Sequence, residues 1–212
     1  MNRVAFLVDG FNLYHSVVDA SYDLGGISTK WLNIHSLCRS YLPHIGRDTT
    51  IEKVYYFSAL ATHLLASDPS VVARHMDYIA CLKPVGIEEQ LARFKPKHIK
   101  CKVCSGTFKR YEEKETDVAI ATRLLELFYF DRCDTAVLVT GDTDIAPAVK
   151  SAKTMFPNKK IVGLFPHKRR NEDLATLVDN SFRINAMKYT QHQFPNPVVL
   201  SDGTQIYRPS TW

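Results

Sequence analysis

The sequence lacks a long N-terminal apolar run and contains few cysteines. The apolar stretch from Val4 to Val8 stops at Asp9, so it is far too short for a signal sequence or a membrane span. The five cysteines are odd in number and scattered, apart from Cys101 and Cys104, which argues against a disulfide framework. These absences predict a cytoplasmic protein without a membrane partner.

Several enzyme signatures are also missing. The P-loop, G-x-G-x-x-G, H-E-x-x-H and G-x-S-x-G patterns do not occur, which removes the usual nucleotide-fold, zincin and hydrolase-elbow interpretations. Asp9-Gly10 and residues 141–144 faintly resemble the motifs of haloacid-dehalogenase-like phosphatases. That chemistry needs a nucleophilic aspartate two residues before Asp9. The chain has Leu7 there, and an alkyl side chain cannot attack phosphorus.

The basic residues are unevenly distributed along the chain. With 212 residues, 45% of them hydrophobic, the chain can bury one substantial core, and its formal net charge is +5. One basic group contains Lys95, Lys97, Lys100, Lys102, Lys109 and Arg110 with His98, and the other contains Lys159, Lys160, Lys168, Arg169 and Arg170 with His167. These groups are either solvated surfaces or contacts for a polyphosphate partner.

The spacing of apolar residues predicts strands that alternate with helices. We expect strands at residues 4–8, 54–61, 135–140, 160–165 and 182–185, and helices at 11–20, 31–41, 69–81, 116–128, 145–155 and 171–178. Residues 85–103 follow Pro84 and contain Gly86 and Pro96, and they are expected to form two short strands. The alternation predicts an α/β fold with a mostly parallel central sheet, helices on both faces, and ligands beyond the carboxyl ends of the strands.

The composition changes after Met187. We expect a domain over residues 1–187 and a tail over 188–212, in which residues 198–200 and 205–207 form a hairpin around Ser201-Asp202-Gly203-Thr204. This hairpin either packs on the domain, where it would cover a sheet edge, or pairs with a second subunit in a homodimer.

Aspartates follow two of the predicted buried strands. Asp9 comes directly after the first strand, and Asp142 and Asp144 follow the strand at 135–140. Each position has a purely structural alternative, because an aspartate there can cap the next helix. A cap needs only one aspartate, however, which leaves one member of the Asp142 and Asp144 pair without a structural reason.

Asp117 lies near the start of the most regular predicted helix, where the helix dipole stabilises a negatively charged side chain. Asp9, Asp117 and Asp142 can nevertheless meet in one crevice. Carboxylates brought together repel one another unless a cation neutralises them. Oxygen ligands of this kind favour Mg²⁺ or Mn²⁺.

Three segments carry a resemblance to a known family. They are Asp9-Gly10-Phe11-Asn12, Glu113-Lys114-Glu115-Thr116-Asp117-Val118, and Thr140-Gly141-Asp142-Thr143-Asp144. Over about residues 3–185 the sequence resembles the NYN domain family, the LabA-like branch of the PIN-like nucleases. Ile145 departs from the phenylalanine expected after the last aspartate, a change that affects packing rather than chemistry.

The resemblance implies a three-layer PIN-like fold and metal-dependent hydrolysis of RNA. It implies that Asp9, Asp117 and Asp142 bind metal, and that Asn12 and Asp144 complete the catalytic site. In metal-assisted hydrolysis the cation activates a water molecule and stabilises the leaving oxygen. A non-catalytic RNA-binding or regulatory module that retains the acidic pocket is the alternative function.

The expected RNA-binding residues are Lys114 and the run Lys168, Arg169 and Arg170, with single-stranded RNA as the partner. Phe108, Tyr111 and Phe165 are candidate stacking surfaces, and burial in the core is the alternative explanation for each.

Cys101-x-x-Cys104 has the spacing of half a zinc ribbon. Zinc would require two further ligands, for which Cys81, His98 and Cys133 are the candidates, and free thiols are the favoured interpretation.

Overall fold

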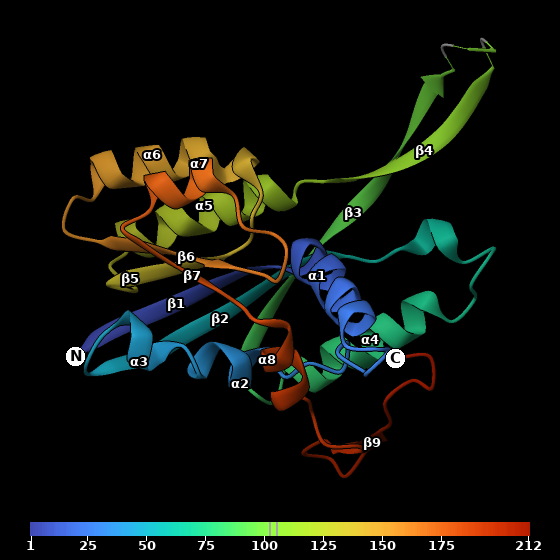
Figure 1. Cartoon of the computed structure of the whole chain (residues 1–212), viewed down its shortest axis with the longest axis horizontal. Helices are drawn as coiled ribbons and strands as arrows, with labels where there is room; N and C mark the ends of the chain where they lie inside the picture. The colour runs from blue at the N-terminus through green and yellow to red at the C-terminus, as the bar shows by residue number, and fades with distance from the viewer. Residues whose placement is uncertain (102, 105) are drawn as a thin grey trace.

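The computed structural model describes residues 1–101, 103–104 and 106–212, and these form a three-layer α/β fold (Figure 1). The central sheet has the strand order β4-β3-β2-β1-β5-β6-β7, and all neighbours are parallel except β3 and β4. Its strands are β1 (Asn2–Asp9), β2 (Thr49–Ala59), β3 (Ile87–Lys100), β4 (Thr107–Lys114), β5 (Thr135–Val139), β6 (Lys160–Phe165) and β7 (Asn180–Arg183). The fold class predicted from the sequence is therefore confirmed.

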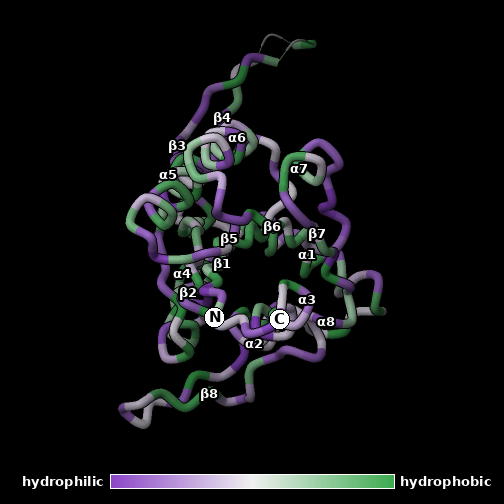
Figure 2. Tube along the Cα trace, turned by 90° about the vertical axis from the view of Figure 1, so that its left-hand side faces the viewer, coloured by the Kyte–Doolittle hydropathy of each residue, from purple (hydrophilic) through white to green (hydrophobic). Residues whose placement is uncertain are grey.

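Helices cover both faces of the sheet, and a separate apolar core lies on each side (Figure 2). One face packs against α1 (Gly10–Asp23), α2 (Ile34–Arg39), α3 (Leu42–Ile45), α4 (Val71–Leu82) and α8 (Ala186–Gln191). The other face packs against α5 (Thr116–Tyr129), α6 (Ala146–Met155) and α7 (Glu172–Leu177). Alternate residues of each buried strand enter the two cores, as Phe6 and Leu7 do.

Strand β1 lies at the centre of the sheet, between β2 and β5. Residues Val4 to Val8 have no exposed surface, as a strand covered on both faces requires. The chain first builds the sheet outward on the β2 side of β1 and later continues on its β5 side. The carboxyl ends of β1 and β5 are thus a topological switch point, where open α/β sheets place their ligand sites.

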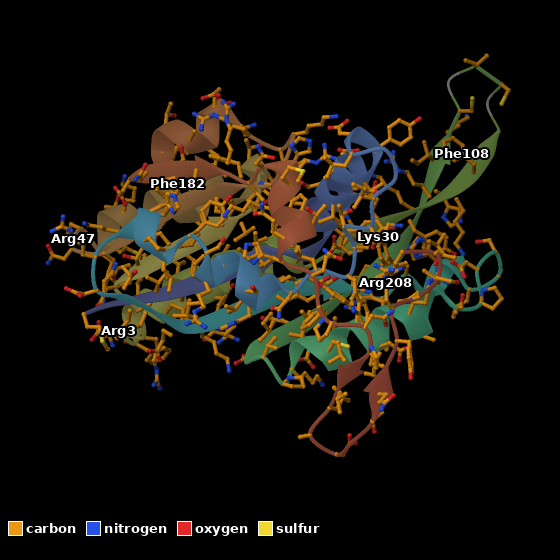
Figure 3. The ribbon with its side chains drawn as sticks, turned by 60° about the horizontal axis from the view of Figure 1, so that its bottom comes forward. Arg3, Lys30, Arg47, Phe108, Phe182 and Arg208 are labelled. Atoms are coloured by element: carbon orange, nitrogen blue, oxygen red, sulfur yellow. The ribbon has the colours of Figure 1, made fainter. Side chains whose placement is uncertain are left out.

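Strands β3 and β4 extend from the body as a long antiparallel ribbon, on which Phe108 lies far from the rest of the chain (Figures 1 and 3). The prediction of two short strands within residues 85–103 was wrong, because β3 is continuous through Pro96. Beyond Ala92 β3 pairs only with β4. A proline is tolerated on such an edge because its missing N–H leaves no central ladder incomplete.

Other predicted boundaries also require correction. Of the helix expected at residues 31–41 only α2 forms, beginning after Asn33, whose side chain accepts a hydrogen bond from the Ser36 amide, and α3 follows outside the predicted range. The last strand of the sheet ends at Arg183 rather than continuing to residue 185, and α8 follows it unpredicted. A short 3-10 turn, η2 (Thr143–Ile145), precedes α6, and another, η1 (Thr62–Leu64), precedes α4.

The tail forms the expected hairpin, from β8 (Val198–Val199) and β9 (Gln205–Ile206). It packs on the helical layer rather than on a sheet edge: the Trp31 indole donates a hydrogen bond to the Pro195 carbonyl at 3.0 Å, and the Trp31 and Trp212 rings lie 6.0 Å apart. Within the part of the chain that the structure describes, no helix combines the length and apolarity needed to cross a membrane.

Candidate active site

Asp9 lies at the carboxyl end of β1 and is 6% exposed. It caps α1, because one carboxylate oxygen accepts a hydrogen bond from the Asn12 amide at 2.9 Å. The other oxygen accepts one from the Thr140 hydroxyl at 2.8 Å. The pKa of Asp9 is raised, chiefly by burial and in part by the negative charge of Asp142. Asp9 therefore caps α1 and at the same time lies in the crevice at the carboxyl end of the sheet.

The loop after β5 is tied to the loop after β1 by two polar side chains. The Asn12 side-chain oxygen accepts a hydrogen bond from the Gly141 amide at 3.1 Å. Buried Thr140 donates to Asp9 and accepts from the Asp142 amide at 3.1 Å. Thr140 was not singled out from the sequence, although its place between the strand and Gly141 marks it as part of this loop.

Asp142 and Asp144 have different environments. Asp142 caps η2 by accepting a hydrogen bond from the Asp144 amide at 3.0 Å, whereas the Asp144 side chain is exposed in the first turn. The cap therefore accounts for one of the two aspartates only.

Gly141 brings a basic loop against the site. A Cβ atom at this position would lie 1.7 Å from the Arg169 carbonyl oxygen, so no other residue fits without moving backbone. The backbone of Arg169 therefore packs against the loop after β5, whereas the side chains of Lys168 and Arg170 pair with Asp23 and Glu172.

Asp117, at the start of α5, has its pKa raised to about 6 by burial and by the charges of Asp142, Asp9 and Asp144. Glu113, near the end of β4, has its pKa raised to about 7, again by burial and then by Asp9 and Asp117. The Thr116 hydroxyl donates a hydrogen bond to the Glu113 carboxylate. These mutual effects show that side chains far apart in sequence share one space. We call Asp9, Glu113, Asp117, Asp142 and Asp144 the acidic cluster.

Sequence reasoning missed Glu113 as a site residue. No strand was expected at residues 112–114, which end β4, while the helix begins at Thr116 as predicted. Glu115, between the two elements, has a left-handed backbone with φ of 82° and pairs with Arg93 and Lys95. This turn directs both Glu113 and Asp117 to the cluster.

The donor set of the acidic cluster fits a hard divalent cation in its chemistry, since all members offer carboxylate oxygens. Across the described ranges, however, no three or more histidine, cysteine, aspartate or glutamate side chains are placed so as to hold a metal ion.

A comparison with protein-family models bears directly on this arrangement. The model described as the NYN domain matches residues 3–185. The chain belongs to the NYN domain family. NYN domains are PIN-like nucleases and typically use divalent metals, so the carboxylates at the switch point lie in a nuclease-like fold.

The fold of this NYN domain is also found in a solved structure. The crystal structure of a protein of unknown function from Vibrio parahaemolyticus RIMD 2210633 matches with a TM-score of 0.57 and 21% sequence identity, over 87% of this chain and 93% of that one. No significant match was found among curated proteins.

The cations predicted to bind RNA already have acidic neighbours in the NYN domain. Lys114 lies 3.0 Å from Glu112. The equivalent pairs in the loop after β6 are Lys168 with Asp23 at 2.6 Å, Arg169 with Asp19 at 2.6 Å and Arg170 with Glu172 at 2.7 Å. Phosphate contacts from these residues therefore require an exchange of partner.

The two basic groups are arranged differently from each other. The first lies on the β3–β4 ribbon, where Lys100, Lys109 and Arg110 form no ion pair with any described residue; Lys102 lies outside the described residues. The second was wrongly treated as one group. Lys159 and Lys160 lie at the start of β6, and the basic loop follows its end, so a strand of about 20 Å separates them.

The three candidate stacking residues also differ. Phe165 is fully buried in the core, which confirms the alternative explanation for it and excludes stacking on RNA. Phe108 is 52% exposed on the ribbon. Tyr111 stacks on His63 of η1, with ring centroids 4.5 Å apart.

All five cysteines are free thiols. Cys81 and Cys133 are buried in the body, while Cys101 and Cys104 flank the outer end of the ribbon, and no third zinc ligand joins them among the described residues.

Proposed function

We propose that this chain is a metal-dependent ribonuclease that hydrolyses phosphodiester bonds of single-stranded RNA at the acidic cluster. The observation that carries the proposal is the convergence of carboxylates from β1, β4, α5 and the β5–α6 loop at the switch point of a NYN domain, where Thr140 joins Asp9 to Asp142 and α5 contacts both β1 and η2. A structural cap accounts for single members of this group but not for the convergence. In this proposal residues 1–187 form the nuclease domain and residues 188–212 a tail on it.

Asp9, Asp117 and Asp142 would hold Mg²⁺ or Mn²⁺. A bound cation would supply charge neutralisation at the phosphodiester and lower the pKa of the attacking water. The hydrogen bonds from Asn12 and Thr140 fix the rotamer of Asp9, as ligands of a metal generally require.

The remaining members would act on water and on the loops. Asp144 is exposed beside Asp142, where its carboxylate can orient the attacking water. Asn12 holds the β5–α6 loop at a fixed distance from α1 through Gly141. Glu113, with a pKa of about 7, can exchange a proton at neutral pH.

Electrostatic attraction to the RNA backbone would come from two places. Lys168, Arg169 and Arg170 belong to the loop whose Arg169 backbone packs on Gly141, and they would exchange their carboxylate partners for phosphates. Lys109 and Arg110 on the ribbon have no acidic partner among the described residues, and their binding to phosphate would be salt-dependent. Lys114 would add a further contact near the cluster.

The protein is proposed to act in the cytoplasm, where its free thiols stay reduced.

The decisive experiment measures cleavage of an end-labelled single-stranded RNA with Mn²⁺, with Mg²⁺ and with EDTA. We expect cleavage by the wild-type protein with metal only, and loss of at least a hundredfold in Asp142→Asn. Asp77→Asn is the matched control, because Asp77 is an exposed aspartate on α4 outside the cluster. Equal cleavage by Asp142→Asn and the wild type would overturn the proposal.

A second candidate function is a non-catalytic RNA-binding or regulatory module. It is favoured by the spacing of the cluster, in which the described side chains do not form a ready metal site. The two candidates differ in one result: RNA binding without cleavage under every metal condition, together with no rise in melting temperature on adding Mn²⁺, would establish the module.

A further inference from the structure

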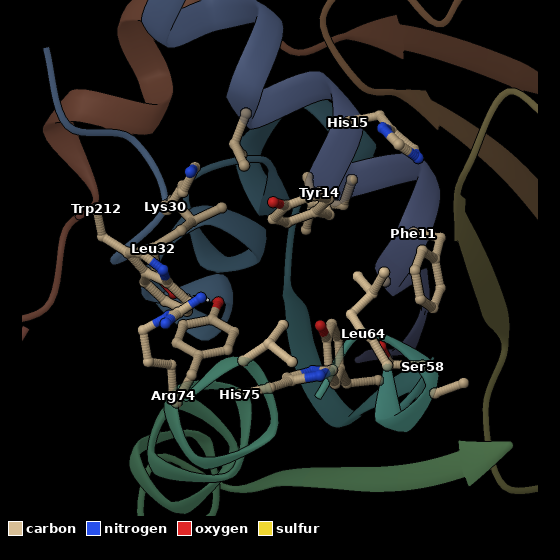
Figure 4. A pocket seen from close by; sticks show the side chains of 18 of the residues that line it. Phe11, Tyr14, His15, Lys30, Leu32, Ser58, Leu64, Arg74, His75 and Trp212 are labelled. Atoms are coloured by element: carbon tan, nitrogen blue, oxygen red, sulfur yellow. Dashed lines mark hydrogen bonds between the residues drawn. The ribbon is translucent and has the colours of Figure 1, made fainter. Parts of the chain in front are cut away.

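A cavity of about 330 Å³ lies next to the acidic cluster, between α1, α4, η1 and the carboxyl end of β2 (Figure 4). Its walls are mainly apolar, and they are rich in aromatic rings that come from five separate parts of the chain. These rings belong to Phe11, Tyr14, Tyr56, Tyr78, Phe94 and Trp212. The function proposed above uses none of them.

The cavity and the acidic cluster share a wall. Phe11 lines the cavity two residues after Asp9, and its ring contacts that of Phe94 edge to face, with centroids 5.3 Å apart. Phe94 pairs with Glu113 across the β3–β4 ladder, so the two side chains emerge side by side on the same face of the ribbon. A ligand bound at the carboxylates therefore has this cavity as its immediate neighbour.

Gly10 enables this close approach. A Cβ atom at position 10 would lie 2.6 Å from the Phe57 carbonyl oxygen and 2.9 Å from the Tyr56 ring. The absence of a side chain thus lets the start of α1 lie directly on Tyr56, and this contact joins the first helix to the cavity wall.

The polar groups of the cavity are few and distinct. Lys30 and Arg74 line the side of the cavity where Trp212 lies (Figure 4), and Arg74 is paired there with Asp68. The Lys30 ammonium lies 5.9 Å from the centre of the Tyr14 ring and forms no ion pair with the described residues. On the opposite side are buried Ser58 and the η1 residue His63, whose Nδ1 is buried without a hydrogen-bond partner in the described structure.

This combination matches a nucleobase. Aromatic faces bind a flat base by stacking regardless of its identity, while neutral hydroxyl and imidazole groups satisfy the polar base edge. Burial lowers the pKa of both His63 and His75, which keeps these rings neutral and able to donate and accept. The volume is at the small end of the range for ligand sites, as expected for one base with its sugar.

We propose that this cavity takes one unpaired nucleobase of the RNA, namely the base of a nucleotide next to the phosphodiester at the acidic cluster. The proposal rests on the ribonuclease function and deepens it. A base can enter the cavity only when it is not paired, so the cavity makes the enzyme select single-stranded RNA over a duplex.

The first test measures binding without cleavage. In EDTA, adenosine and uridine 5′-monophosphates are titrated into the protein and followed by tryptophan fluorescence, since Trp212 lines the cavity. We expect both to bind at least tenfold more tightly than ribose 5-phosphate, and Tyr14→Ala to weaken them about tenfold. Tyr22→Ala is the matched control, because Tyr22 lies on the same helix, is 89% exposed and does not line the cavity. A second variant, Ala61→Phe, fills the cavity and should block binding without removing a wall residue.

The second test uses RNA substrates in which one nucleotide at a time is abasic. We expect a single position beside the cut to slow wild-type cleavage about tenfold, and to have no further effect in Tyr14→Ala. Monophosphates that bind no better than ribose phosphate, or that bind Tyr14→Ala and Ala61→Phe normally, would overturn the cavity proposal even if RNA is cleaved. If no RNA is cleaved under any condition, the ribonuclease function fails, and the binding test still decides whether the cavity holds a base.

Discussion

Replacing Asp117 with asparagine should make the metal-free protein more stable. Asp117 has a pKa of about 6, compared with 3.8 for an ordinary aspartate, because burial and three neighbouring carboxylates disfavour its charge. Each pKa unit corresponds to about 1.4 kcal/mol, or about 3 kcal/mol in total. The side chain is only half-buried and solvent screens part of this effect, so about 1.5 kcal/mol is expected.

The pH dependence of this effect has a definite sign. Between pH 3.8 and about pH 6 the folded protein retains a proton on Asp117 that the unfolded chain has released. The stability of the wild type therefore falls as the pH rises through this window. Asparagine carries no charge at any pH, so the advantage of the variant should be full at pH 7.5 and absent near pH 4.

The assay is thermal unfolding in EDTA at pH 7.5 and pH 4.5, with Asp77→Asn as the control. For a chain of this size about 1.5 kcal/mol corresponds to a rise of roughly 3–6 °C in melting temperature at pH 7.5. Mn²⁺ should stabilise the wild type and not the variant. A variant that is less stable than the wild type at pH 7.5, or equally stabilised at both pH values, would refute the electrostatic reasoning.

Further predictions follow from the same contacts. Gly141→Ala should lower the melting temperature by more than 5 °C, because its Cβ atom would collide with the Arg169 carbonyl, whereas Gly46→Ala, whose Cβ atom would lie 3.5 Å from its nearest neighbour, should change it little. Thr140→Val removes a donor to Asp9 and should destabilise the protein by about 1–2 kcal/mol in urea unfolding, while the isosteric Thr135→Val, which loses one partly buried bond, should cost less. The Mn²⁺ concentration for half-maximal stabilisation should rise as the pH falls below about 6, since protonated carboxyl groups do not bind metal; a flat profile would contradict it.

The predictable parts of the fold are the strands whose sequence is a continuous apolar run, because such a run indicates burial on both faces of a sheet. The apolar runs at 4–8, 135–140 and 160–165 have no alternative to burial on both faces, and β1, β5 and β6 are found there. The carboxyl-edge positions of Asp9 and Asp142 follow directly from those strands.

The elements that were missed depend on contacts that local sequence does not contain. Pro96 predicted a break, because proline has no N–H to donate within a sheet. The structure shows that β3 has β4 as its single neighbour at this position, so the missing N–H interrupts no second pairing. Helix α8 is short and buries little beyond Ala186 and Tyr189, so its pattern is weak.

The sequence predicted the aspartates of the candidate site, but it did not predict Glu113 or the neighbouring aromatic cavity. Glu113 was missed because acidic residues next to a helix are usually read as part of its first turn, whereas a left-handed residue at Glu115 separates the strand from the helix. The aromatic cavity was missed because its walls come from segments as distant as Phe11 and Trp212.

The length of the β3–β4 ribbon connects its outer end to the candidate site at its base. Eight residue pairs, from Arg93–Lys114 to Lys100–Thr107, extend it by about 25 Å beyond its attachment to β2. Glu113 and Phe94 pair at the base of the ribbon. Glu113 belongs to the acidic cluster, and Phe94 belongs to the cavity wall. By simple geometry a rotation of about 5° at the base displaces the tip by about 2 Å over this length. A partner that binds the outer end of the ribbon and rotates it would therefore displace Glu113 in the acidic cluster and Phe94 in the cavity wall together.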